Sequence, residues 1–167
     1  MNIQALNNVS NYLTSGTGMR QVWDYAIKVP GGKKIFSRMV GMAAPYTGSI
    51  PFEIIELKPG FSRTKLADRR PIRNHLNSIH AIALLNFAEV TSGVALLCGI
   101  PDDCRGILKH ISIDYLKKAR GRLTGSCQFL PPETNVKQDL ELEVSICNSK
   151  NEVVAKAKTV WRLGPKK

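Results

Sequence analysis

The segment that decides the fold runs from Ser78 to Cys98 and reads SIHAIALLNFAEVTSGVALLC. It contains no proline, reaches its first glycine only at Gly93, and carries a single formal charge, on Glu89. A helix that is apolar on nearly all sides is buried on nearly all sides. We therefore predict a long helix at the centre of the molecule, with one carboxyl group near its middle.

A membrane-spanning helix is the alternative, because the stretch 79–100 has about the length needed to cross a bilayer. His80, Asn86 and Glu89 would each be costly in lipid without a partner. The segments on both sides alternate between apolar and polar residues and can cover this helix as strands of a sheet. The sequence therefore favours a core helix and no membrane span.

Composition indicates one globular chain with a preference for anionic partners. Of its 167 residues, 43% are hydrophobic and 22% charged, and the net charge is +11. Eleven Lys or Arg lie between Arg20 and Arg73 and twelve between Lys109 and Lys167, so the positive charge brackets an apolar centre. Charge alone suggests nucleic acid, a phosphorylated cofactor or an acidic membrane surface. Aromatic residues are only 7% and do not interleave with the basic runs, so we expect no specific nucleic-acid binding.

The cysteines and the N-terminus both point to the cytoplasm. Cys98, Cys104, Cys127 and Cys147 form no C-x-x-C pair and no metal-like spacing with histidine, so we expect buried free thiols and no metal site. Residues 1–11 lack a cationic start and an apolar signal core.

Residues 1–49 are predicted to form a helical extension packed on the core. Val22, Tyr25 and Ala26 keep helical spacing before the break at residues 30–32. A second apolar stripe follows and ends at Pro45; its members are Ile35, Phe36, Met39, Val40 and Ala43. We interpret both stripes as surfaces that pack against the core.

Residues 50–167 are predicted to form an α+β domain. Two strands joined by a turn at Pro59-Gly60 precede the helix, and four strands follow it. The strand with the clearest alternation has Leu140, Leu142, Val144 and Ile146 on one face. Residues 148–151 join this strand to the last strand as a hairpin. The result is an antiparallel sheet wrapped around one helix.

The residues just before the helix could bind an oxyanion. Ser78 or Asn77 can cap the helix, and the N–H groups of its first turn then carry positive dipole. Asn74 and His80 add polar groups that can orient a carbonyl.

Glu89 admits a structural and a functional interpretation. Its carboxyl could be satisfied by Thr91, Ser92 or Asn86, or it could be a functional acid, because burial disfavours the ionised form. It follows His80 by nine residues, which places the two side chains on roughly opposite helix faces, about 13 Å apart along the axis. They could meet across a twofold dimer with antiparallel helices.

Over residues 52–163 the sequence resembles the hot-dog fold of acyl-CoA thioesterases of the phenylacetyl-CoA and 4-hydroxybenzoyl-CoA type. The spacing of Asn74, His80 and Glu89 carries the resemblance. It implies that Glu89 is the general base or nucleophile, that the N–H of Ala81 faces the oxyanion, and that His80 and Asn74 orient the carbonyl and water. It also implies a homodimer, or a tetramer of paired dimers, and coenzyme A as part of the substrate with no further cofactor. The basic residues Lys117, Lys118, Arg120 and Arg122 would then lie beside the coenzyme A phosphates, although a solvated strand end is their alternative role.

Three positions depart from the family pattern. Ala81 and Ile82 stand where two glycines usually follow the histidine, and Asn77 stands where a glycine is common. We expect Ile82 to narrow the acyl or pantetheine passage. The departures leave a second hypothesis open, in which the domain binds an acyl group or acyl-CoA without catalysis.

Overall fold

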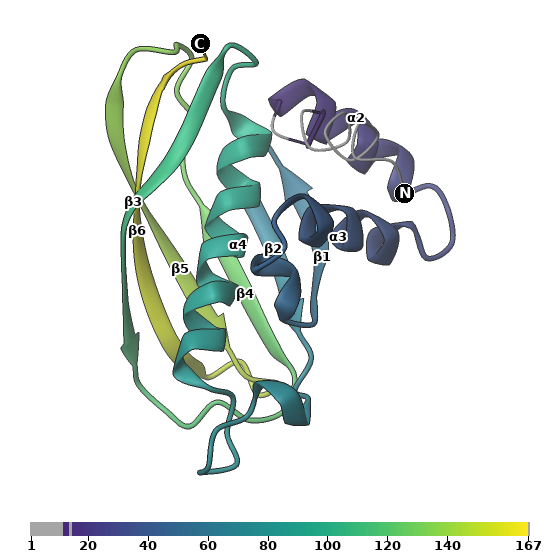
Figure 1. Cartoon of the computed structure of the whole chain (residues 1–167), viewed down its shortest axis with the longest axis vertical. Helices are drawn as coiled ribbons and strands as arrows, with labels where there is room; N and C mark the ends of the chain where they lie inside the picture. The colour runs from purple at the N-terminus through teal and green to yellow at the C-terminus, as the bar shows by residue number, and fades with distance from the viewer. Residues whose placement is uncertain (1–11, 14, 167) are drawn as a thin grey trace.

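The predicted central helix is present as α4, which runs from Ala81 to Gly99 in a computed structural model that describes residues 12–13 and 15–166. Most of its residues are buried, and the sheet curves around it (Figure 1). Within the described residues it is the one helix long and apolar enough to cross a membrane, and it is enclosed in this fold instead. The core-helix prediction is therefore confirmed, with a start three residues later than expected.

All six strands belong to one antiparallel sheet, with spatial order β1-β2-β4-β5-β6-β3. Two strands precede α4 and four follow it, as the sequence predicted. Their bounds are Phe52–Lys58 for β1, Phe61–Leu66 for β2, Cys104–Tyr115 for β3, Leu123–Gln128 for β4, Gln138–Cys147 for β5 and Val153–Pro165 for β6.

Both predicted hairpins are present. The β1–β2 turn uses Gly60 at φ +71°, a left-handed conformation that glycine adopts at little cost. The β5–β6 turn is held by the Asn148 side chain, whose Oδ1 accepts from the N–H groups of Lys150 and Glu152. On β5, Leu142, Val144 and Ile146 are buried as the alternation indicated.

Helices α2 (Gly16–Ala26) and α3 (Gly32–Ala43) precede the sheet, with the short helix η1 (Thr47–Ser49) after them. Trp23 of α2 packs edge-on against Phe36 of α3, with ring centroids 5.3 Å apart. Both helices lie on the side of α4 that the sheet leaves uncovered (Figure 1). This helical part was predicted, and a division of the chain at residues 49 and 50 stays a prediction.

Two residues of the predicted apolar stripes do not pack on the core. Tyr25 is 70% exposed and Ile35 is 55% exposed. Helical spacing alone assigned both residues to the apolar stripes. In the structure the buried face of each helix is narrower than the predicted stripe, and these two side chains lie outside it. Residues 1–11, for which no signal peptide was predicted, lie outside the described residues.

Candidate active site

The start of α4 is capped by His80. Its Nδ1 accepts a hydrogen bond from the N–H of Ile82 at 3.1 Å, whereas Ser78 or Asn77 was expected to be the cap. That expectation is wrong because Ser78 and Ile79 continue the preceding loop, where the N–H of Ile79 bonds to the carbonyl of Ala119. Since Nδ1 accepts, the neutral ring carries its proton on Nε2, which is left as a donor on an exposed side chain.

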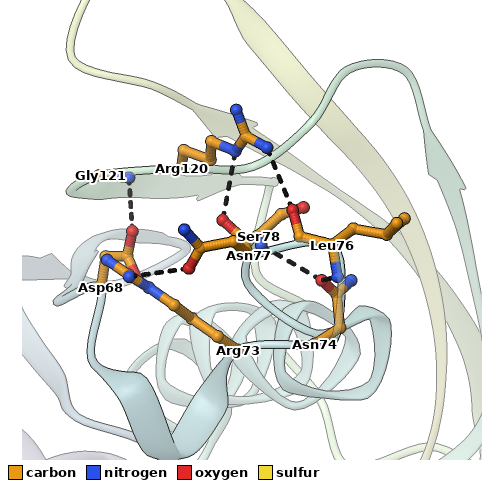
Figure 2. A network of polar contacts seen from close by, with 8 residues as sticks. All are labelled: Asp68, Arg73, Asn74, Leu76, Asn77, Ser78, Arg120 and Gly121. Carbon is orange, nitrogen blue, oxygen red and sulfur yellow. Dashed lines mark hydrogen bonds and ion pairs between the residues drawn. The ribbon is translucent and has the colours of Figure 1, made fainter.

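Asn74 shapes the loop that leads into α4. Its Oδ1 accepts from the N–H groups of Leu76 and Ser78 (Figure 2). Asn77 has φ +56°, a left-handed conformation that asparagine tolerates better than most residues. The position where glycine is common in the resembling family therefore keeps the backbone that glycine would favour.

Asp68 joins this loop to the segment before β4. Its Oδ1 accepts from Nε of Arg73 at 2.6 Å, and its Oδ2 accepts from the N–H of Gly121 at 2.7 Å (Figure 2). The hydrogen bond from Arg73 holds the pKa of the Asp68 carboxyl below its usual range. The ends of β2 and the start of β4 are thereby fixed relative to the loop that begins α4.

The four basic residues expected near coenzyme A phosphates have different surroundings, and Arg122 lines a groove beside α3. Arg120 donates to the backbone carbonyls of Asn77 and Leu76, so its guanidinium braces the α4 loop (Figure 2). Lys117 pairs with Glu152 at 2.7 Å. Lys118 makes no ion pair within the described part of the chain.

A cavity of about 370 Å³ lies beside the start of α4. It brings together Asn74, Ala81, Lys117 and Lys118, four of the residues singled out in the sequence. Tyr115 also lines it and donates from its hydroxyl to the carbonyl of Ala81 at 3.0 Å. The cavity therefore combines a helix N-terminus with cationic side chains, an arrangement suited to a ligand with a developing negative charge.

Glu89 lies half-buried on α4 and is contacted by Thr47 of η1. The Thr47 hydroxyl donates to Oε2 of Glu89 at 3.3 Å. Burial raises the pKa of the Glu89 carboxyl above its ordinary value, and the Thr47 hydrogen bond opposes that rise in part. The partners expected for a structural acid are engaged elsewhere: Asn86 donates to the carbonyl of Tyr46, and Thr91 and Ser92 donate to backbone carbonyls of α4.

Sequence reasoning missed Thr47. It lies 42 residues before Glu89, in a short helix that the pattern marked only as a chain break after Pro45. No periodicity links the two positions, so only the packing of the N-terminal helices on α4 reveals the contact.

A second cavity, of about 190 Å³, opens beside Glu89. Its other lining residues are mostly apolar and come from the segment before α2 and from α2, α3, η1, α4 and β6; they include Leu13, Met19, Val40, Val94, Leu97 and Trp161. This cavity does not include His80, Asn74 or Ala81. Within one chain, Glu89 therefore lies in a different cavity from the residues that were expected to bind an oxyanion.

Replacing Thr47 with Val removes the hydroxyl while nearly conserving side-chain shape. Because that hydroxyl lowers the pKa of Glu89, the variant is expected to have a Glu89 pKa higher than the parent's. A carboxyl-carbon NMR titration of both proteins measures this directly. Replacing Ser49, an exposed residue of the same short helix, with Ala serves as control, and an unchanged Glu89 titration in Thr47→Val would exclude the contact.

Within residues 12–13 and 15–166, no three His, Cys, Asp or Glu side chains are arranged to hold a metal ion. The four thiols are free, and Cys98, Cys104 and Cys127 are buried. Burial raises the pKa of the Cys98 thiol to about 11 and that of Cys127 to about 12. These thiols are therefore poor nucleophiles at neutral pH.

A family model for a domain of unknown function, DUF4442, matches residues 32–163. The chain belongs to the DUF4442 family. The match begins at the first residue of α3, so the matched region includes this helix as well as the sheet. No curated protein matches the chain.

Solved structures show the same fold as this DUF4442 chain. A structural-genomics target is 28% identical, with a TM-score of 0.75, and covers 88% of this chain and 97% of its own. A Pseudomonas aeruginosa protein described as a probable thioesterase is 20% identical, with a TM-score of 0.71, over 77% of this chain and 93% of its own. A Streptococcus mutans protein bound to acetyl-CoA is 17% identical, with a TM-score of 0.60, over 70% and 91%. The fold is therefore the hot-dog fold of thioesterase-like proteins, which confirms the resemblance.

Proposed function

We propose that this DUF4442 protein hydrolyses acyl-CoA thioesters. The observation that carries the proposal is Glu89, a half-buried carboxyl with a raised pKa that borders an apolar cavity. General bases with a raised pKa transfer protons efficiently near neutral pH. The fold shared with a probable thioesterase and with an acetyl-CoA-bound protein supports the substrate class.

In the proposed reaction the Glu89 carboxylate takes a proton from water while the water oxygen adds to the thioester carbonyl carbon. The carbonyl oxygen becomes an oxyanion, which receives hydrogen bonds from the N–H of Ala81 and from Nε2 of His80, with Asn74 holding their loop. The carbon–sulfur bond then breaks, and sulfur leaves with the electron pair and takes the proton from Glu89. The products are a carboxylic acid and the free thiol of coenzyme A. Direct attack by the Glu89 carboxylate on the carbonyl is the other route open to the same residue.

Two features favour a homodimer in which His80 of one protomer approaches Glu89 of its partner. The twelve-residue strand β3 pairs only with β6 within the described chain, and its free edge carries the 54% exposed Ile107. Long unpaired apolar edges readily pair with another strand. On α4, Ile82, Leu85 and Glu89 follow one another at helical spacing and none of them is fully buried. An antiparallel pair of such helices would bring each acid to the other helix start.

Mixing two inactive variants tests this shared site. Glu89→Gln and His80→Ser homodimers are each expected to lack thiol release, and serine retains the helix cap. After subunit exchange, half of the dimers are mixed and each has one intact site, so about one quarter of parent activity should appear. If each site lies within one protomer, mixing restores nothing.

Binding of acyl-CoA without hydrolysis is the second candidate, favoured by Ala81 and the 50% exposed Ile82 at the positions of two family glycines. A thiol-release screen over short, long and aromatic acyl-CoAs distinguishes the two. Binding by calorimetry with no release would favour the non-catalytic module, and turnover of one substrate excludes it. We propose no cofactor beyond the coenzyme A of the substrate and a cytoplasmic location, which the free thiols support.

A further inference from the structure

A groove of about 900 Å³ lies between α3 and the β1–β2 hairpin. It lies on the other side of α3 from the Glu89 cavity. Lys34 and Arg38 of α3 line the groove, whereas Val40 and Ala43 line the Glu89 cavity. The groove is therefore distinct from the site described above.

Five cationic side chains line this groove with one carboxylate among them. The cations are Lys34, Arg38, Lys65, Arg69 and Arg122, and the carboxylate belongs to Glu53, so the formal balance is 5 − 1 = +4. None of the five makes a side-chain hydrogen bond or ion pair within the described part of the chain. By contrast, Arg73, Arg120 and Arg162 are all engaged. Cationic side chains that lie close together without anionic partners repel one another. A bound anion would offset this unfavourable electrostatic energy.

The backbone at one end of the groove is held in place. Arg69 follows Asp68 and Arg122 follows Gly121, and the Asp68 carboxylate bonds to the N–H of Gly121 (Figure 2). The two guanidinium groups thus extend from neighbouring, fixed segments. On the hairpin, Glu53 and Lys65 are direct cross-strand partners. Charges carried by fixed backbone are preorganised for a ligand and lose less freedom on binding.

Apolar side chains line the same groove beside the cations. Phe52, Met42 and Pro45 are among them, and Phe52 is half-buried. The Phe52 ring offers a stacking surface for a base, and the guanidinium groups that line the same groove offer bidentate donors for phosphate. The Glu53 carboxylate can accept a hydrogen bond from a ribose hydroxyl or an exocyclic amine.

We propose that this groove binds a nucleotide with two or more phosphate groups. Its volume falls within the range of small-ligand sites, and its charge matches a polyphosphate. A hollow bounded by one helix and one hairpin favours a small ligand over an extended nucleic acid, which needs a long basic track with repeated stacking residues. The nucleotide could be free or could be the adenosine end of coenzyme A; only the second source rests on the proposed hydrolysis.

The test measures binding of adenosine 3′,5′-bisphosphate, pyrophosphate and adenosine by calorimetry at fixed ionic strength. The groove variant is Arg38→Gln with Arg69→Gln, and the control variant is Lys137→Gln with Lys156→Gln, which removes the same charge from exposed residues elsewhere. We expect the bisphosphate to bind the parent and the control alike, and the groove variant at least about tenfold more weakly. Adenosine should bind far more weakly than the bisphosphate, with pyrophosphate in between.

Several results would overturn the proposal. They are equal binding by the parent and groove variant, equal weakening in the control variant, or absence of bisphosphate binding to the parent. If duplex DNA competes for the groove and binds more tightly than the nucleotide, the groove is a nucleic-acid site and the proposal is wrong. Loss of coenzyme A binding in the groove variant would instead support the proposal and identify the adenosine end of coenzyme A as the source of the nucleotide. If Glu89→Gln still binds the bisphosphate, the nucleotide proposal stands even when the protein hydrolyses no acyl-CoA.

Discussion

Replacing Glu89 with Gln is expected to lower the rate of thiol release from acyl-CoA by about 10²–10⁴-fold, the range attributable to a general base. The amide has nearly the same shape and can still accept the Thr47 hydrogen bond, but it cannot take a proton from water. The measurement is the initial rate of free thiol formation at saturating acyl-CoA. Glu143→Gln, an exposed residue of β5, is the matched control.

Thermal unfolding separates loss of chemistry from loss of fold in this variant. The folded pKa of Glu89 is raised, so its stabilising contribution is present below the unfolded pKa and is lost as pH rises through the folded pKa. The amide does not titrate, so Glu89→Gln should be at least as stable as the parent above that window. Activity equal to the parent's would remove Glu89 from the mechanism. A lower melting temperature at pH 8 would instead show that the carboxylate is structural.

The fold could be predicted from the sequence because each main helix and strand has a recognisable pattern within its own residues. The apolar run around Phe87 could be buried only as a core helix, and the alternation from Leu142 to Ile146 gave both a strand and its inward face. Residues at element ends were less predictable. His80 caps α4 in place of Ser78 because the preceding loop is tied to Ala119, a contact between distant segments.

The candidate site could be predicted only in part, for the same reason. The spacing along one helix predicted where the Glu89 and His80 side chains lie relative to each other. The family resemblance implied their catalytic roles. Thr47 and the basic groove depend on where α3 and η1 pack, which no period in the sequence encodes. The net charge of +11 indicated an anionic partner, but only the fold shows that Arg38, Arg69 and Arg122 line one hollow.

The segment from α3 to η1 borders both of the proposed sites. One face of α3 lines the apolar cavity beside Glu89, and another lines the basic groove. Thr47, at the end of this segment, contacts the carboxyl itself. The family match, which starts at residue 32, includes this whole segment. The segment from α3 to η1 thus forms a wall of both cavities, whereas α2 lines only the cavity beside Glu89.

Replacing Gly48 with Ala is expected to push η1 away from α3. A Cβ at Gly48 would lie 2.5 Å from the carbonyl oxygen of Gly41 and 2.9 Å from its carbonyl carbon, so two backbones would have to separate. Overpacking of this kind costs about 2 kcal/mol, which corresponds to a melting temperature lower by about 4–8 °C for a chain of this size. Because Thr47 is the preceding residue, its contact with Glu89 should loosen as well.

Gly164→Ala is the matched control, because a Cβ there meets no atom within 4 Å. It should melt within about 2 °C of the parent. Two measurements on Gly48→Ala then separate two claims. An unchanged melting temperature would contradict the close approach of α3 and η1. A lower melting temperature with an unchanged Glu89 titration would show that this approach stabilises the fold without positioning the acid, whereas a raised Glu89 pKa would tie the N-terminal helices to the chemistry of α4.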